Sequence, residues 1–415
     1  MGIVSFAKGL LRRHFVDTRP IQIPDYRRLL TGQAVAFVGF QLTAVAVSAE
    51  VYALTRSSFW VGMLGPVALV PLIVFGLWGG AIADAMDRRK LLLAASLISW
   101  SATLVLLVNA FTLKNVWVIM AAVAVQSTGF AVASPTRNAI IPRLVPTPLV
   151  PAANTLNFLF SSIASVLGPL LGGFILAGGG YGFAYLIDAV LFTAVLYAAL
   201  RLPALEPLGE VTAPGFRAVV GGLRYIMATP IVLMSFVVDI IAMAFAMPRA
   251  LYPEMTAIRF GDSGIAYGWL SAAIALGAVA GGVFSGWVGR VRRQGLALTF
   301  VIVVWGLTVA AAGLAQALWL MVLLLAFGGF ADLVSAVWRQ TILQTYAPDE
   351  MRGRLQGVFF VVVAGGPRLG DLRAGATASA FGLVPAWVGG GVLCAVTVVI
   401  VGLAVSSFRR YHVRS

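Results

Sequence analysis

Cysteine, histidine and acidic residues are scarce in this 415-residue chain. It holds one cysteine, two histidines and 15 aspartate and glutamate residues, against 29 lysines and arginines. The single cysteine, Cys394, excludes an internal disulfide and a cysteine metal cluster. His14 and His412 lie near the two chain ends, so no histidine relay can carry protons through the middle of the molecule. Any titratable chemistry inside the protein must therefore fall on carboxylates.

Charged residues are few as well, and their scarcity indicates that the protein is surrounded by lipid. Only 11% of residues are charged, 60% are hydrophobic, and the mean hydropathy is +0.96. A water-soluble protein could not bury that much apolar surface. Apolar runs of roughly 20 residues recur along the chain, and each is long enough to cross a bilayer as a helix. The chain is therefore predicted to be an all-α polytopic membrane protein.

The apolar runs predict about twelve transmembrane helices. The segment before the first run carries its own charges and lacks a short apolar core with a small-residue cleavage site, so we do not expect a cleaved signal peptide. The predicted spans lie near 26–54, 58–83, 91–111, 116–140, 150–178, 181–200, 229–253, 263–289, 295–314, 317–345, 355–380 and 384–407.

Basic residues gather on one side of the predicted helices. The loops on the opposite side hold little beyond Arg56, Lys114 and Arg259. By the positive-inside rule, both termini are predicted to be cytoplasmic. The same bias accounts for the net charge of +14. Because the basic clusters are divided among several loops and do not form one face, no nucleic-acid partner is expected.

The chain is predicted to divide into two halves of six helices. Its expected parts are a cytoplasmic segment 1–25, a helical bundle 26–200, a cytoplasmic linker 201–228, a second bundle 229–408 and a tail 409–415. Residues recur between the halves at a constant offset of 202 positions: Gly79-Gly80 with Gly281-Gly282, Arg88 with Arg290, and Arg137 with Arg339. A constant offset favours parallel repeats related by an axis along the membrane normal, with the substrate between them near the midplane.

The turn after the second predicted span places an acid and a basic cluster at the membrane surface. Residues 79–90 read Gly-Gly-Ala-Ile-Ala-Asp-Ala-Met-Asp-Arg-Arg-Lys. They resemble the loop between spans 2 and 3 of the major facilitator superfamily of transporters, although Ala85 replaces the usual basic residue and Asp87 the usual glycine. An acid at a helix end can pair with basic residues or with the positive end of a neighbouring helix. The resemblance implies a conformational latch formed by Gly80, Asp84, Arg88, Arg89, Arg137 and Arg339; the alternatives are a turn that only sets topology and, for Arg137 and Arg339, interfacial anchors.

The fifth predicted span contains a proline flanked by glycines. Gly168, Pro169, Gly172 and Gly173 follow the Gly-Pro-x-x-Gly-Gly pattern, which resembles the signature of proton-driven exporters of this superfamily. Proline removes a backbone hydrogen bond, and glycine lets a neighbouring helix approach. The pattern favours export over import, although small residues are also common in membrane helices that serve no such purpose.

The second half carries several charges deep inside predicted spans. Ionised groups at this depth cost several kcal/mol unless they are paired or face water. Asp239, Asp332 and Asp371 are therefore candidates for the group that releases and rebinds a proton, with Arg368 and Arg373 as charge partners or substrate ligands. Arg368 and Asp371 are three residues apart on one helix face and are expected to neutralise each other. The alternative is that these residues form static ion pairs that only position helices.

The predicted spans of the first half are less charged but are polar in places. Gln33, Gln41, Gln126 and Glu50 are candidate substrate contacts, with helix-to-helix hydrogen bonding as the alternative, and Asp188 is similar. Span 4 lacks the arginine of many proton antiporters, because Val123 occupies that position. No metal site, catalytic residue or cofactor is predicted, and the absence of a Gly-x-x-x-x-Gly-Lys loop argues against ATP as the energy source.

Over residues 20–405 the chain resembles the branch of the major facilitator superfamily that includes the bacterial enterobactin exporter. The supporting segments are 25–29, 84–90, 249–253, 343–354 and 366–371. The resemblance implies a bacterial inner-membrane exporter, monomeric and not an enzyme, that exchanges protons for a siderophore or an amphipathic drug-like compound by alternating access. A lipid flippase or scramblase of the same fold, a broad multidrug efflux pump and a membrane sensor remain alternatives. The expected partners are a small-molecule substrate, protons and membrane lipids.

Overall fold

The computed structural model describes residues 17–206, 216–346, 352–405 and 408. The side chains of residues 77–85, of 216–220 and of several positions at the start of helix α14 lie outside the described set. Throughout the part of the chain that is described, the regular elements are helices, with no strand. The prediction of an all-α fold is confirmed.

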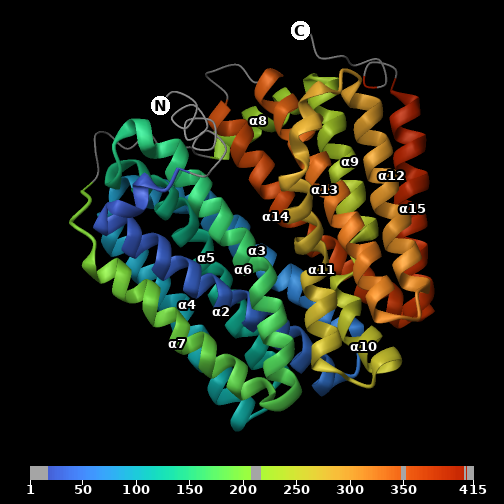
Figure 1. The fold of residues 1–415 in the computed structure, drawn as a ribbon, viewed down its shortest axis with the longest axis horizontal. Helices are drawn as coiled ribbons and strands as arrows, with labels where there is room; N and C mark the ends of the chain where they lie inside the picture. Colours follow the sequence, from blue (N-terminus) through green and yellow to red (C-terminus); the bar gives the residue numbers. More distant parts are fainter. Residues whose placement is uncertain (1–16, 207–215, 347–351, 406–407, 409–415) are drawn as a thin grey trace, which may run out of the picture.

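The long helices fall into two consecutive groups (Figure 1). The first group holds α2 (Pro24–Thr55), α3 (Ser58–Ala85), α4 (Arg88–Phe111), α5 (Val116–Leu144), α6 (Val150–Gly178) and α7 (Gly180–Arg201). The second holds α8 (Phe216–Ala228), α9 (Pro230–Ala246), α10 (Tyr252–Phe260), α11 (Gly264–Val283), α12 (Gln294–Leu314), α13 (Leu318–Tyr346), α14 (Arg352–Phe381) and α15 (Leu383–Ala404). Short 3₁₀ turns lie at Arg19–Gln22, Thr147–Leu149, Arg249–Leu251 (η3) and Ser285–Arg290.

Eleven helical segments of the described chain are long and apolar enough to cross a membrane. Helix α14, with 30 residues, is equally long but carries Arg368, Asp371 and Arg373 in its second half. It accounts for the predicted span at 355–380, the one that the eleven apolar segments leave out. The protein is a multi-pass membrane protein.

The seventh span differs from its prediction. A continuous helix over 229–253 was expected, but α9 ends at Ala246, and Met247 is extended with φ −79° and ψ 115°. Pro248 explains the break, because proline lacks a backbone N–H and disfavours helical geometry in the residue before it. The chain then makes the single turn η3 and resumes as α10. The seventh span is therefore two helices separated by an irregular joint.

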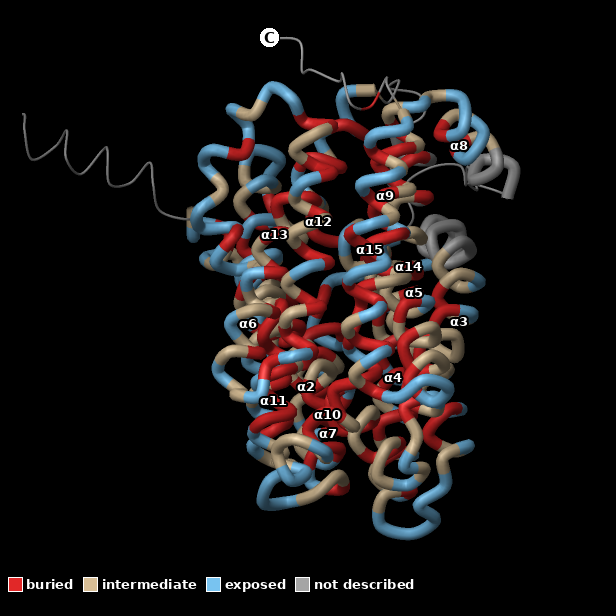
Figure 2. Tube along the Cα trace, turned by 90° about the vertical axis from the view of Figure 1, so that its right-hand side faces the viewer, coloured by how far each residue is buried: buried red, intermediate tan, exposed pale blue. Residues whose placement is uncertain are grey.

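The outer surface of the helices is apolar. Phe174, Val283, Phe300 and Trp319 each leave 68% or more of their surface exposed. Figure 2 shows buried segments running through the interior, while the turns at both ends are largely exposed. Large exposed apolar residues over many helices are unusual in soluble proteins and are the expected face of helices in contact with lipid.

Buried tryptophans tie the second group together. The indole N–H of Trp387 in α15 donates to the Val309 carbonyl in α12 at 2.8 Å, and that of Trp305 donates to Ala242 at 3.4 Å. Each indole thus fills core volume and satisfies a backbone carbonyl on a neighbouring helix. In the first group, the Tyr26 hydroxyl donates to the Ala153 carbonyl at 2.7 Å and joins α2 to α6.

The two groups meet through α3 against α14 and through α6 against α11. Glycine makes both contacts possible. A Cβ atom at Gly65 would collide with the backbone of Arg368, and one at Gly173 would collide with Gly264 and Gly268. Backbone therefore packs on backbone, as at other small-residue interfaces between membrane helices.

Two polar contacts between the groups lie at the end of the molecule opposite the termini (Figure 1). Arg56 Nη1 lies 3.5 Å from Asp262 Oδ2, and the Ser58 hydroxyl donates to Glu254. Arg56 and Asp262 both adopt left-handed backbone conformations, with φ 51° and 58°. The groups are thus joined at one end of the molecule.

Candidate functional site

A cavity of about 750 Å³ lies between the two groups of helices. Its wall takes residues from α2, α3 and α6 on one side and from η3, α10, α11, α13 and α14 on the other. The α6 and α11 helices show how it arises: they touch at Gly173 and Gly268, whereas Ser162 and Val279 further along them line the cavity. Its volume falls in the range usual for small-molecule sites.

The cavity wall carries three charged side chains, Arg249, Asp332 and Asp371, beside the polar residues Gln41, Ser48 and Tyr267. The structure thus places two of the three predicted proton-carrier candidates, and Gln41, on one cavity. The sequence alone did not identify Arg249 as a site residue. The two prolines that flank it, Pro248 and Pro253, were the available signal, because they predict an interrupted helix.

Asp371 interacts with groups on both parts of the broken seventh span. Its carboxylate lies in the field of Arg249 and Arg368 and contacts the backbone amide of Ala250. Its Oδ1 atom is buried and has no hydrogen-bond partner among the described residues. A buried carboxylate oxygen without a donor is costly, so this atom can receive a donor from a ligand.

Arg368 and Asp371 do not form the expected intrahelical ion pair: among the described side chains, no bridge within 4 Å joins them. The Arg368 guanidinium instead donates to the Ala364 carbonyl in its own helix at 2.5 Å. It remains close enough to Asp371 to act on it electrostatically.

Arg373 bonds to backbone carbonyls of two other helices. Its guanidinium donates to the carbonyls of Ala244, at 3.1 Å, and of Phe245, and it also reaches the Ala386 carbonyl in α15 at 3.3 Å. Ala244 and Phe245 belong to the last turn of α9, where carbonyls have no helical N–H to accept from. Arg373 therefore caps the helix end at the joint, with its charge at the negative end of the helix dipole.

Asp239 forms a buried ion pair with Arg339, and Arg339 Nη2 lies 3.7 Å from Asp332 Oδ1. Asp239 and Arg339 are each 4% exposed. The interpretation of Arg339 as an interfacial anchor does not fit this position, because the guanidinium is inside the helix group. Arg339 lies 202 positions after Arg137, and this repeat suggested a common role for the two arginines. Of the two, only Arg339 has two carboxylates beside it among the described residues.

The first group of helices holds a buried hydrogen-bond network around Asp188. Thr43 and Thr103 donate to Asp188 Oδ2 at 2.7 and 3.1 Å, and the Gln126 amide donates to the Thr103 hydroxyl at 3.3 Å. Glu50 is also buried and accepts from the Tyr185 hydroxyl at 2.5 Å. Gln126 and Glu50 thus bond to neighbouring helices and are not among the residues that line the central cavity.

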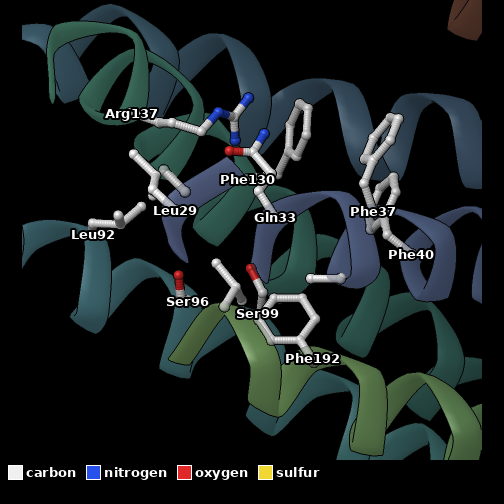
Figure 3. Close-up of a pocket in the computed structure, with 13 residues that line it drawn as sticks. Leu29, Gln33, Phe37, Phe40, Leu92, Ser96, Ser99, Phe130, Arg137 and Phe192 are labelled. Carbon is white, nitrogen blue, oxygen red and sulfur yellow. The ribbon is translucent and has the colours of Figure 1, made fainter. Parts of the chain in front are cut away.

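Arg137 and Gln33 line a separate pocket of about 60 Å³ among α2, α4, α5 and α7. The two side chains point toward one another beside Phe130 (Figure 3). Phe37 and Phe40 continue the aromatic lining. This pocket is far smaller than the central cavity.

The glycine and proline pattern of the fifth span lies at two helix contacts. A Cβ atom at Gly168 would collide with Gln41 and Val38 of α2, and Gly172 faces Leu42. Gly173 faces α11 of the other group, and Pro169 lines the central cavity. The pattern therefore allows α6 to pack closely against α2 of its own group and against α11 of the other group.

Two of the six residues of the predicted latch, Gly80 and Asp84, lie outside the described side chains. Arg88 Nη1 donates to the Ala139 carbonyl at 3.0 Å, and Arg89 Nη2 donates to the Leu200 carbonyl at 2.7 Å. Asp87 caps α4 by accepting from the Arg89 amide and also accepts from the Leu205 amide at 3.2 Å. This turn is bonded to the chain that follows α7, and its latch role stays a prediction.

Comparison with known proteins gives consistent matches along most of the chain. The family model described as "Transmembrane secretion effector" matches residues 17–411. The enterobactin exporter EntS of Shigella boydii is 28% identical over 375 residues, which are 87% of this chain and 89% of that protein; EntS of Citrobacter koseri is 28% identical over 374 residues, with the same coverage.

Solved structures agree in fold. The crystal structure of the nucleoside transporter NupG aligns with a TM-score of 0.73 and 12% identity, over 94% of this chain and 100% of NupG. An inward-facing bacterial homologue of the human lysosomal transporter Spinster aligns with a TM-score of 0.70 and 16% identity, over 95% of this chain and 97% of the homologue. At these identities the likeness concerns the fold alone.

Proposed function

The chain belongs to the transmembrane secretion effector family of the major facilitator superfamily, and from that membership we propose that it exports a siderophore in exchange for protons. The family is one of membrane transporters, and the similar proteins of the comparison are named enterobactin exporters. The observation that carries the proposal is the cavity between the two helix groups, with Asp332 and Asp371 in its wall. A cavity between repeated halves is where transporters of this kind bind their substrate.

Alternating access is the proposed route. The contacts Arg56–Asp262 and Ser58–Glu254 join the helix groups at the end opposite the termini. With both termini in the cytoplasm of a bacterium, as the positive-inside rule favours, these contacts close the outer side of the inner membrane. Their release, together with closure at the opposite end, would expose the same cavity to the outside.

Asp371 is the proposed proton carrier. It lines the cavity, and one of its buried oxygens has no donor in the part of the chain that the structure describes. Asp239 is instead held by Arg339. Protonation removes a charge from a medium of low dielectric constant, which favours a different arrangement of the halves. A membrane potential adds about 2.3 kcal/mol per charge for each 100 mV, enough to bias a cycle that moves net charge.

The proposal is tested by proton movement in proteoliposomes that contain the purified protein and an internal pH dye. Metal-free enterobactin, added to one side, is expected to drive proton flux in the wild type and to lose that effect in Asp371→Asn. Asp25→Asn is the matched control, since Asp25 lies at the exposed start of α2 and pairs with Arg28.

Two other results would be decisive. Proton flux that persists in Asp371→Asn but disappears in Asp332→Asn would move the coupling site within the same cavity. Absence of flux in the wild type, accompanied by exchange of a fluorescent phospholipid between leaflets, would replace the exporter with a flippase.

A further inference from the structure

We propose that Arg249 and Asp371 together form the recognition pair of the central cavity, and that this pair binds a substrate group with a hydroxyl donor beside an oxygen acceptor. The metal-free form of an oxygen chelator has this group, whereas its metal complex does not. The inference rests on the proposed function and specifies how the same cavity selects its substrate.

The irregular joint in the seventh span positions Arg249 in the cavity wall. Arg249 begins η3, its side chain is exposed, and it lies in the cavity wall. None of the described residues bonds to its guanidinium or pairs with it within 4 Å. Irregular backbone at membrane depth is tolerated where it lines a cavity, and such interruptions commonly present ligand groups there. Arg249 therefore supplies up to five unused donors to the cavity.

Asp371 supplies the complementary acceptor. Its carboxylate accepts a hydrogen bond from the backbone amide of Ala250, the residue after Arg249 on η3. Its Oδ1 atom has no donor among the described residues. The charged or titratable groups that act on it are Arg249 from η3, Arg368 and Arg373 from its own helix, Tyr252 from α10 and Tyr267 from α11. Donor and acceptor thus face one cavity from neighbouring elements without satisfying each other.

A chelator changes its hydrogen bonding when it takes up a metal. Oxygen ligands must lose their protons to bind a cation, so loading the chelator removes its hydroxyl donors. The loaded form would leave Asp371 Oδ1 without a donor, and its negative charge would meet the carboxylates of Asp332 and Asp371 in the wall. A site built to hydrogen-bond a substrate hydroxyl discriminates strongly against an analogue that lacks it.

The test is a pair of binding measurements on purified protein, by intrinsic tryptophan fluorescence, with metal-free enterobactin and its gallium(III) complex. The wild type is expected to bind the metal-free form at least about ten-fold more tightly. Asp371→Asn should weaken binding of the metal-free form by about ten-fold and reduce the preference, whereas Asp25→Asn should change neither affinity. Arg249→Gln should weaken binding of the metal-free form while leaving the protein folded.

Folding of each variant is checked by size exclusion and thermal unfolding. If Asp371→Asn fails this check, Asp371→Glu replaces it, since it keeps the acceptor and should keep the preference at reduced affinity. Equal affinity of the wild type for both forms, or an unchanged preference in Asp371→Asn, overturns the inference and leaves siderophore export standing. If neither form binds and neither is moved in proteoliposomes, the proposed function fails and the inference fails with it.

Discussion

Arg339 lies between two carboxylates, those of Asp239 and Asp332, inside the C-terminal group of helices. From this position we expect it to contribute first of all to the stability of the fold. It pairs with Asp239 and approaches Asp332 while only 4% exposed. Removing one partner of a buried ion pair leaves an uncompensated charge, which costs more than the pair itself contributes.

We expect Arg339→Met to lower the free energy of unfolding by about 3–5 kcal/mol, because Asp239 loses its buried cation. Thermal unfolding in detergent measures the change. The double variant Asp239→Asn with Arg339→Met should recover part of the loss, since it removes the stranded charge. Equal stability of the single and double variants would contradict a direct pairing.

The site residues show where sequence interpretation reaches its limit. Asp371 and Asp332 were predicted to matter because charges at membrane depth are costly, and the structure places both on the central cavity. Arg249 was missed and Arg339 was misplaced for the same reason: depth along a helix follows from position in the sequence, but the partner on another helix does not. No one-helix pattern predicts that Arg373 bonds to carbonyls 129 and 128 positions away.

At the scale of elements, the joint between α9 and α10 depends on α14. Arg373 bonds to the carbonyls of Ala244 and Phe245, and it also reaches α15 through Ala386. One guanidinium therefore fixes the end of α9, from which Met247 and Pro248 lead to Arg249.

We expect Arg373→Met to destabilise the protein by about 2–4 kcal/mol and to reduce transport, because hydrogen bonds from a charged donor to the α9 carbonyls are lost. The measurements are thermal unfolding and substrate flux in proteoliposomes. Arg368→Met is the matched control, since Arg368 donates to Ala364 within its own helix and should cost less than Arg373 does. Equal costs for the two variants would contradict a capping role for Arg373.

The helices themselves were largely predictable from the sequence. Apolar runs identify spans because lipid contact requires them, and the eleven apolar segments agree with that expectation. The break near Pro248 escaped prediction because the segment Pro230–Phe260 is apolar on average, with Met247 and Ala250 apolar on either side of Pro248 and Arg249. Backbone geometry at a proline is a local steric effect that an average over a span conceals.

At the scale of the whole molecule, the two helix groups are held at one end by few polar contacts. Arg56–Asp262 is an exposed pair, with side chains 65% and 61% accessible. Such pairs contribute about 0–1 kcal/mol each. The balance between the two arrangements of the halves that alternating access proposes should therefore be easy to shift.

We expect the combined change Arg56→Ala and Ser58→Ala to favour opening on the outer side, because it removes the Arg56–Asp262 and Ser58–Glu254 contacts between the groups. The measurement uses Ser48→Cys, in the cavity wall, on a background in which Cys394 is changed to serine. A membrane-impermeant thiol reagent added outside should label Ser48→Cys about three-fold or more faster after the two contacts are removed, which corresponds to a shift of roughly 0.6–1 kcal/mol.

Labelling from outside that does not respond to the two changes would contradict the proposed gate. Thr55→Ala is the matched control, since its hydroxyl bonds within its own chain segment, to Val51 and Ser57, and not to the other group.

The backbone-on-backbone contact between α3 and α14 has a mechanical consequence. Where Gly62, Gly65 and Gly375 meet the opposite helix, no long side chain has to change rotamer when one helix moves on the other. The contact can therefore serve as a pivot between the two helices. Helix α14 has 30 residues, about 45 Å at 1.5 Å per residue, and a tilt of about 10° about one end carries the other end through about 8 Å. In the proposed alternating-access cycle, a tilt of this kind would turn a small rearrangement at the joined end into an opening for a small-molecule substrate.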